Sequence, residues 1–263
     1  MDSSDIFELI PIWAVFALAL LLALASVELG YRWARRKQRR AAHEHEQEKE
    51  APVGAMVGAT LGLLAFLLAF TFGMAADEFH ERKLALLDEA SAIETAYLRA
   101  GTVTEPHRTE VRKLLREYVE ERLQRVGGGA TARPATVLLR ALWQHTEAAV
   151  ARDPGDITGL FEESVNDIIT LKSEQLMVRE RSRIPAEFWL MLHVIAAVAL
   201  AAMGYHGGVA GTARSPVTAA VALTFALVMV LIADIDRPGE GWIEVPQDAM
   251  LDLRTALAEE AGG

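Results

Sequence analysis

The sequence predicts an all-α membrane protein with four transmembrane helices, paired in two hairpins, and a helical extramembrane domain between the second and third spans. Hydrophobic residues make up 52% of the 263 residues, and they gather in four stretches that hold no charged residue. Each stretch has roughly the 20 apolar residues that a helix needs to cross a bilayer. Between the second and third stretches, apolar side chains recur every three or four residues, which is typical of amphipathic helices.

The positions of the spans follow from where charge ends and begins again. The spans are expected at about residues 9–31, 52–76, 187–205 and 215–234. The domains are expected at 1–76 for the first hairpin with its basic linker 32–51, 77–185 for the helical domain, 186–236 for the second hairpin and 237–263 for an acidic C-terminal tail. The third span is expected to end near Tyr205, because the glycines of "MGYHGGVAG" weaken a helix. The first span is expected to stay uncleaved, because a signal peptide starts with basic residues and "MDSSDIFELIP" has none.

Basic residues predict the orientation in the membrane. The linker carries the cluster "RWARRKQRR", whereas the segment before the first span has no Lys or Arg. Short loops rich in Lys and Arg stay in the cytoplasm, so we expect the linker there and both termini and the helical domain on the non-cytoplasmic side. Arg179, Arg181 and Arg183 favour the opposite orientation, but long translocated segments are largely exempt from this rule.

Composition and motifs exclude several classes of protein. The chain has no cysteine, so it holds no disulfide and no thiolate metal site. Its net charge is −10, and no basic face remains outside the linker to bind nucleic acid. HExxH, P-loop and G-x-G-x-x-G motifs are absent, so we predict no catalytic residues and no enzyme activity. His193 lies inside the third span and is expected to hydrogen-bond across helices.

The segment between the two hairpins is predicted to contain four helices. The first continues the second span from Asp77 and ends at Gly101, and the next ends at the glycines of "RVGGG". A third helix is expected over Pro134–Arg152, and a fourth begins near Asp156 after "DPGD". Their apolar faces must be buried against one another or against a neighbouring subunit.

The second span holds the main candidate functional residues, spaced four apart. They are the helix-packing glycines Gly54, Gly58 and Gly62 and the pore-lining candidates Phe66, Phe70 and Met74. Glycines at this spacing let helix backbones approach closely in lipid. If several subunits surround an axis, the large side chains form a hydrophobic constriction of the kind that gates by dewetting. Packing against lipid or neighbouring helices is the alternative, and the pattern alone favours it.

Acidic residues follow the fourth span in "VLIADIDRPGEGWIEV". Asp234 and Asp236 have three roles open to them: capping the helix, pairing with Arg237, or binding a hard cation such as Ca²⁺ through oxygen. Two aspartates are too few for a closed calcium site, which would need carbonyls, water, Glu240 or Glu244 as well. A salt bridge with Arg237 or with Arg82 is favoured, and Ca²⁺ is the one candidate cofactor.

Two segments together resemble a bacterial family of membrane proteins described as bestrophin-like. They are "GLLAFLLAFTFGMAADEFHERKLALLDEASAIETAYLRA" and "ADIDRPGEGWIEV". The family patterns "EAxAIxTAYLR" and "D-x-D-R-P" match this chain at Glu89, Tyr97, Arg99, Arg237 and Pro238. Glu94, at a variable position inside the first pattern, is counted with these family-motif residues. All four spans fit the family layout, so the resemblance covers most of the chain.

The resemblance implies a function. True bestrophins are pentameric anion channels gated by calcium, with a phenylalanine-lined neck on the second span and an acidic calcium clasp after the fourth. We therefore expect a homo-oligomer in the inner membrane of a bacterium that contacts lipid and passes small inorganic anions. Phe66 and Phe70 would form its constriction, and Asp234 with Asp236 would set its divalent sensitivity. Bestrophins keep both termini in the cytosol, which is opposite to what the linker predicts.

A second function stays open. The chain is alternatively a non-conducting membrane scaffold or sensor whose helical domain binds a partner. The direction of Phe66 and Phe70 distinguishes the two functions, because a channel turns these rings towards an axis lined by subunits. A scaffold instead holds them in a dry interface between helices.

Overall fold

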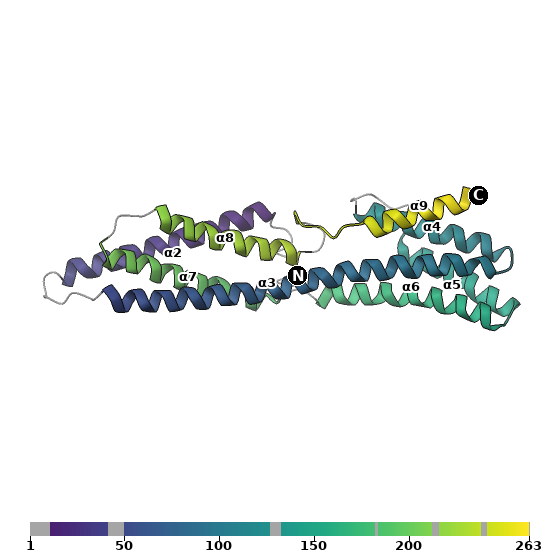
Figure 1. Cartoon of the computed structure of the whole chain (residues 1–263), viewed down its shortest axis with the longest axis horizontal. Helices are drawn as coiled ribbons and strands as arrows, with labels where there is room; N and C mark the ends of the chain where they lie inside the picture. The colour runs from purple at the N-terminus through teal and green to yellow at the C-terminus, as the bar shows by residue number, and fades with distance from the viewer. Residues whose placement is uncertain are drawn as a thin grey trace. The chain divides into compact units, whose positions relative to one another are not determined.

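A computed structural model describes residues 11–41, 50–126, 133–181, 184–211, 216–237 and 241–262 (Figure 1). The described residues form helices and no strand, which confirms the predicted all-α class. In chain order the helices are α2 (Ile12–Ala41), α3 (Glu50–Arg99), the 3₁₀ helix η1 (Ala100–Thr102), α4 (His107–Val126), α5 (Ala135–Arg152), α6 (Asp156–Arg181), α7 (Ala186–Val209), α8 (Pro216–Asp236) and α9 (Asp248–Gly262). The chain divides into two compact units, Met1–Glu78 with Arg183–Glu244 and Phe79–Ser182 with Val245–Gly263.

Four helical segments are long and apolar enough to cross a membrane. They are Ile12–Arg40, Pro52–Thr102, Glu187–Val209 and Pro216–Asp236. They overlap the four predicted spans, and the second continues past residue 76 as the rest of helix α3. Residues 9 and 10 and Ser215 of those predictions lie outside the described residues. Large apolar side chains on these segments stay uncovered, for example Leu18 and Leu190, which are both 67% exposed. Such side chains are expected to contact lipid or another subunit.

In the first unit, α2 packs against α7 and α8, and α7 packs against α8 (Figure 1). Small side chains bring the three helices together, with Ala23, Leu200 and Ala222 fully or almost fully buried in one cluster. A second cluster joins Ile12 of α2 to Val230 of α8. Without water to expel from between helices, close packing of this kind is what holds membrane helices together.

Glycines set the closest approach between α2 and α7. A methyl group at Gly204 would come nearer to the carbonyl oxygen of Val27 than the 3.0 Å that side-chain carbons keep. A methyl group at Gly30 would meet the carbonyl of Ala201 in the same way. Helix α7 therefore continues to Val209, past Tyr205 where the sequence predicts the end of the span. Gly204 and Gly208 of that stretch lie against the backbone of α2 and do not end the helix.

The second unit is a helical bundle with one hydrophobic core. Helix α4 packs against α5 and α9, and α5 packs against α6, while the second half of α3 contributes to the same core. Its fully buried side chains include Tyr97 of α3, Leu115 of α4, Leu142 of α5 and Phe161 of α6. The observed α5 begins one residue after the predicted start at Pro134, and α6 begins at the predicted Asp156.

Helix α9 belongs to this second core. The sequence sets residues 237–263 apart as an acidic tail, whereas the structure divides them between the two units. Met250, Leu253 and Leu257 of α9 are buried in the core of the second unit, because their spacing places them on one face of the helix. The acidic residues of α9 lie on its other faces.

Candidate functional site

The predicted pore-lining residues lie on an uncovered side of α3. Phe66 and Phe70 are 66% and 61% exposed, and Met74 is half-buried. A step of four residues turns a helix by about 40° beyond a full rotation, so Gly62, Phe66 and Phe70 lie on one side of α3. That side is available to lipid or to another subunit, and the pore-lining role stays a prediction.

The three helix-packing glycines of α3 differ in their surroundings. A methyl group at Gly54 would lie 2.9 Å from Nε2 of His206 in α7. Among the described residues, no atom comes within 4 Å of a methyl group placed at Gly58 or Gly62. Among the described residues of one chain, therefore, only Gly54 of these three lies beside another helix, and close packing at Gly58 or Gly62 would need a second subunit.

Asp234 lies in the last turn of helix α8 and accepts hydrogen bonds from the segment that follows the helix. Its Oδ1 accepts the backbone N–H of Trp242 at 2.8 Å, and its Oδ2 accepts the backbone N–H of Ile243 at 3.0 Å. The carbonyl of Asp234 accepts the backbone N–H of Arg237 at 3.3 Å. Gly241 leaves room for the carboxylate, since a methyl group there would lie 2.6 Å from Oδ1. The carboxylate of Asp234 thus holds the backbone at Trp242 and Ile243 against the end of α8.

Asp236 is also buried, and its Oδ1 accepts the backbone N–H of Ile184 at 3.2 Å. No group of three or more His, Cys, Asp or Glu suited to a metal occurs among the described residues. With both oxygens of Asp234 already accepting N–H bonds, the described residues do not make a closed calcium site. The calcium role of the two aspartates stays a prediction. Pro238 of the family motif lies outside the described residues.

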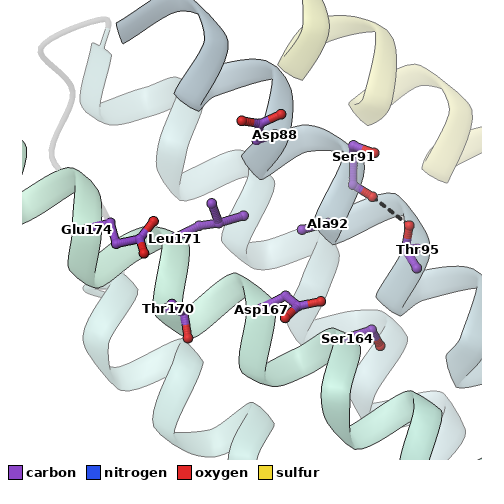
Figure 2. A pocket seen from close by; sticks show the side chains of 9 residues that line it. All are labelled: Asp88, Ser91, Ala92, Thr95, Ser164, Asp167, Thr170, Leu171 and Glu174. Atoms are coloured by element: carbon purple, nitrogen blue, oxygen red, sulfur yellow. Dashed lines mark hydrogen bonds between the residues drawn. The ribbon is translucent and has the colours of Figure 1, made fainter. Parts of the chain in front are cut away.

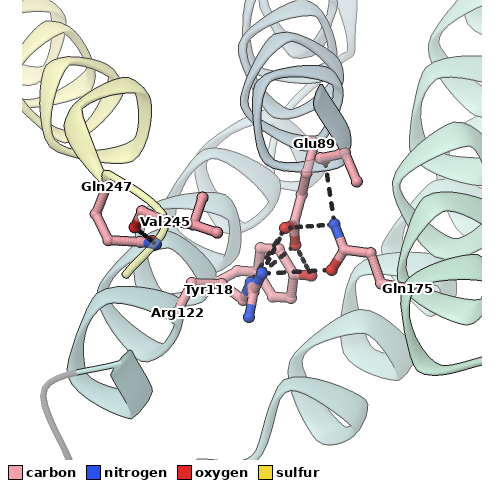
Figure 3. Close-up of polar contacts among 7 residues, drawn as sticks. Glu89, Tyr118, Arg122, Gln175, Val245 and Gln247 are labelled. Carbon is pink, nitrogen blue, oxygen red and sulfur yellow. Dashed lines mark hydrogen bonds and ion pairs between the residues drawn. The ribbon is translucent and has the colours of Figure 1, made fainter. Parts of the chain in front are cut away.

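Glu89 is the centre of a buried polar network in the second unit. Figure 3 shows side chains of α3, α4 and α6 converging on its carboxylate, which is fully buried. Arg122 donates to both oxygens, from Nε to Oε1 at 2.9 Å and from Nη2 to Oε2 at 2.7 Å. Tyr118 donates its hydroxyl to Oε1 at 2.7 Å, and Gln175 donates Nε2 to Oε2 at 3.0 Å. Each oxygen of the buried Glu89 carboxylate therefore accepts two of these hydrogen bonds, as a buried polar group requires.

The network fixes the charge of its members. Burial alone would raise the pKa of the Glu89 carboxyl, but the charge of Arg122 and the hydrogen bonds from Arg122, Tyr118 and Gln175 outweigh burial, so that pKa is lowered. Burial and the negative charge of Glu89 raise the pKa of the Tyr118 hydroxyl. The carboxylate is thus held ionised and the phenol protonated, which suits a structural ion pair and not proton transfer near neutral pH.

Further charges lie close to this network. Glu121 of α4 is 3% exposed, pairs with Arg125 and accepts the backbone N–H of Ala135 at 3.2 Å. Lys172 of α6 is 8% exposed. Burial and the neighbouring charge of Arg122 lower the pKa of the Lys172 ammonium group. The interior of the second unit is therefore built around paired carboxylates and arginines as well as around apolar side chains.

The other family-motif residues of α3 hold neighbouring elements. The ring of Tyr97 is fully buried under the guanidinium of Arg112, 4.9 Å from its centroid, and its hydroxyl accepts Nη1 of Arg116 at 3.1 Å. Arg99 donates Nη1 to the carbonyl of Leu160 at 2.6 Å. Glu94, in contrast, is exposed. The buried members of the motif thus have packing roles.

An open groove of about 430 Å³ lies between α3 and α6 (Figure 2). Its lining residues are Asp88, Ser91, Ala92, Thr95, Ser164, Asp167, Thr170, Leu171 and Glu174. Carboxylates and hydroxyls dominate this lining, so the groove suits a polar contact and not an apolar ligand.

Sequence reasoning missed Tyr118, Arg122 and Gln175 as members of the network. A signal for two of them was present, because Tyr118 and Arg122 follow the buried Val111 and Leu115 at helical spacing on α4. An arginine on a buried face requires a buried carboxylate partner. The sequence carried no comparable signal for Gln175.

Comparisons with known proteins agree on one relationship. A family model described as "Bestrophin-like domain" matches residues 16–250. The solved structure of a bacterial bestrophin homologue from Klebsiella pneumoniae is similar, with a TM-score of 0.66 at 14% identity, covering 94% of this chain and 97% of that one. A variant of that homologue with a tryptophan replaced by alanine gives a TM-score of 0.67 at 15% identity, covering 96% and 97%. A comparison with curated proteins finds no match.

Proposed function

The chain belongs to the bestrophin-like family, and on this premise we propose that it is one subunit of a homo-oligomeric channel for small inorganic anions, with α3 along the permeation path. The resemblance to bestrophins supports the oligomer and the preference for anions. The four membrane-spanning helices supply the anchoring that such a channel requires. The proposal fits a protein whose described residues carry buried ion pairs for structure rather than an arrangement for catalysis.

One observation carries the proposal: the uncovered aromatic side of α3. Phe66 and Phe70 stay 66% and 61% exposed although the same helix contributes buried residues such as Leu64 and Leu68, which are 0% and 3% exposed. One side of helix α3 is thus buried within the chain, and the other side is exposed. Beside the rings, Gly62 and Gly73 have no described atom within 4 Å of an added methyl group. A second copy of α3 could approach such a surface, and rings from several copies would form a hydrophobic constriction.

Replacing Phe66 or Phe70 by alanine is expected to raise the single-channel conductance or loosen the gating, because a smaller side chain widens a dewetted constriction. The change should be about twofold or more. The measurement is planar-bilayer recording of the purified protein under anion and cation gradients, together with the reversal potential that reports anion preference.

Leu18→Ala in α2 is the matched control, because Leu18 is as exposed as Phe66 but lies on another helix. Its conductance should equal that of the wild type. Identical behaviour of Leu18→Ala and Phe66→Ala would argue that the rings only contact lipid. Silent bilayers, with folded protein at normal yield, would instead favour the non-conducting scaffold or sensor.

We also propose that the protein lies in the bacterial inner membrane with the basic end of α2 in the cytoplasm. The last turns of α2 expose four arginines, Arg35, Arg36, Arg39 and Arg40. Positive charge of this kind next to a span is typical of its cytoplasmic side. A reporter that is active only outside the cytoplasm, fused to the C-terminus, should therefore be active. Activity of a cytoplasm-specific reporter at the same position would reverse the orientation.

A further inference from the structure

Two histidines of the second unit face each other with their ring nitrogens. His107 is the first residue of α4 and His145 lies in α5, and their Nδ1 atoms are 3.2 Å apart. The rings meet edge to face, with centroids 5.5 Å apart and planes at 63°. Both residues are half-buried, so each ring has one side in the protein and access to water.

The scaffold holds this pair in place. One turn after His107, Val111 is fully buried in the core, and His145 lies between the buried residues Leu142 and Ala149 of α5. Helices α4 and α5 pack directly against each other. The separation of the two Nδ1 atoms is therefore set by rigid elements, as a preformed binding site requires.

The separation matches a shared metal ion. A neutral imidazole presents one lone pair, and in a direct N–H···N bond only one of the two rings uses it. Zinc binds histidine nitrogen at about 2.0–2.1 Å, so two nitrogens 3.2 Å apart subtend about 103° at the ion, close to the tetrahedral angle. Both lone pairs would then be used, each directed at the ion and not at the other nitrogen.

We propose that His107 and His145 form a binding site for a divalent transition-metal ion of the zinc class. Imidazole binds zinc, copper and nickel well, whereas calcium and magnesium prefer oxygen ligands. No third His, Cys, Asp or Glu completes a metal-binding group among the residues that the structure describes, so the remaining ligands of a bound ion would have to be water molecules. A bound ion would join the start of α4 to the middle of α5. This inference concerns the extramembrane unit and does not depend on the proposed channel function.

Thermal unfolding of the full-length protein in detergent, with ZnCl₂ or with EDTA, tests the site. An ion that binds only the folded protein raises its stability, so Zn²⁺ at a hundredfold excess over its Kd should raise Tm by about 5 °C. His107→Gln and His145→Gln should each remove this rise while the variants melt near the wild type in EDTA. His80→Gln, which changes an exposed histidine of α3 outside the pair, should keep the full rise.

Titration of the wild type with Co²⁺ gives a second measurement that does not require the variants to fold. Tetrahedral Co²⁺ absorbs visible light, and the signal should saturate at one ion per chain and be displaced by Zn²⁺. The proposal is overturned by an unchanged wild-type Tm together with no Co²⁺ absorption. It is equally overturned by a Zn²⁺-dependent rise that both histidine variants retain.

Discussion

Glu89→Ala is expected to destabilise the second unit by about 3–5 kcal/mol, because removing one partner of a buried ion pair leaves the other charge uncompensated. The side chain of Arg122 is 15% exposed and would lose all of its bonds to the carboxylate. Tyr118 would lose its acceptor as well, and Nε2 of Gln175 would keep the carbonyl of Ala85 alone. For a chain of this size the loss corresponds to a fall in Tm of about 10 °C, measured by circular dichroism on the purified protein.

Glu94→Ala is the matched control for this prediction. Glu94 lies on the same helix and belongs to the same stretch of sequence, but it is exposed. Its replacement should change the stability by no more than about 0.5 kcal/mol. If Glu89→Ala melted at the same temperature as Glu94→Ala, the buried pair would contribute nothing to the stability of the unit.

The pH dependence of unfolding gives the same prediction a second readout. The pKa of Glu89 is lower in the folded than in the unfolded protein. Its ionised form therefore stabilises the fold fully above the unfolded pKa of a glutamate, about 4.3, and this stabilisation is lost as pH falls through the lower folded pKa. Glu89→Gln should melt below the wild type at neutral pH, and the difference should shrink on acidification. A constant difference from neutral pH down to pH 3 would contradict the assignment.

Much of the fold was predictable because the relevant information is local. Charge is absent where the chain crosses the membrane, and the helices of the second unit are separated by Gly and Pro clusters that sequence reasoning recognises. The predicted Pro134–Arg152 and the observed α5 differ at one end residue only. Signals of this kind can be recognised in the sequence itself, without knowing which helices contact one another in the fold.

The candidate site was less predictable because its partners are distant in sequence. Glu89 meets Tyr118, Arg122 and Gln175 across separations of 29, 33 and 86 residues. Its family motif drew attention to Glu89, but not to the side chains that neutralise it. The exposed side of α3 poses a different difficulty. Whether Phe66 faces lipid or a pore depends on how the subunits assemble, and the sequence of one chain does not specify that arrangement.

The glycines show that spacing in the sequence does not identify which of them pack against another helix. Four-residue spacing drew attention to Gly54, Gly58 and Gly62 on α3, whereas the close approach within the first unit uses Gly30 and Gly204. Gly204 belongs to "MGYHGGVAG", whose glycines predict a weak point of the helix. Propensity disfavours glycine in a helix, but close packing of backbones overrides that preference in lipid.

Gly204→Ala is expected to cost about 3 kcal/mol, at the upper end of the usual penalty for overpacking. The added methyl group would meet the backbone carbonyl of Val27, and a backbone atom inside a helix cannot move aside as a flexible side chain can. Helices α2 and α7 would have to separate along their contact. The measurement is thermal unfolding in detergent together with the yield of protein recovered from membranes.

Gly62→Ala is the control on α3, because no described atom lies within 4 Å of its added methyl group. It should be neutral, or stabilising by up to about 1 kcal/mol through helix propensity, unless it disrupts an oligomer without unfolding the chain. The double variant of Gly30→Ala with Gly204→Ala should cost less than the sum of the single variants, since helices already forced apart by one methyl group have room for the second. Strictly additive losses would mean that the two glycines act at independent contacts and not at one shared approach of α2 and α7.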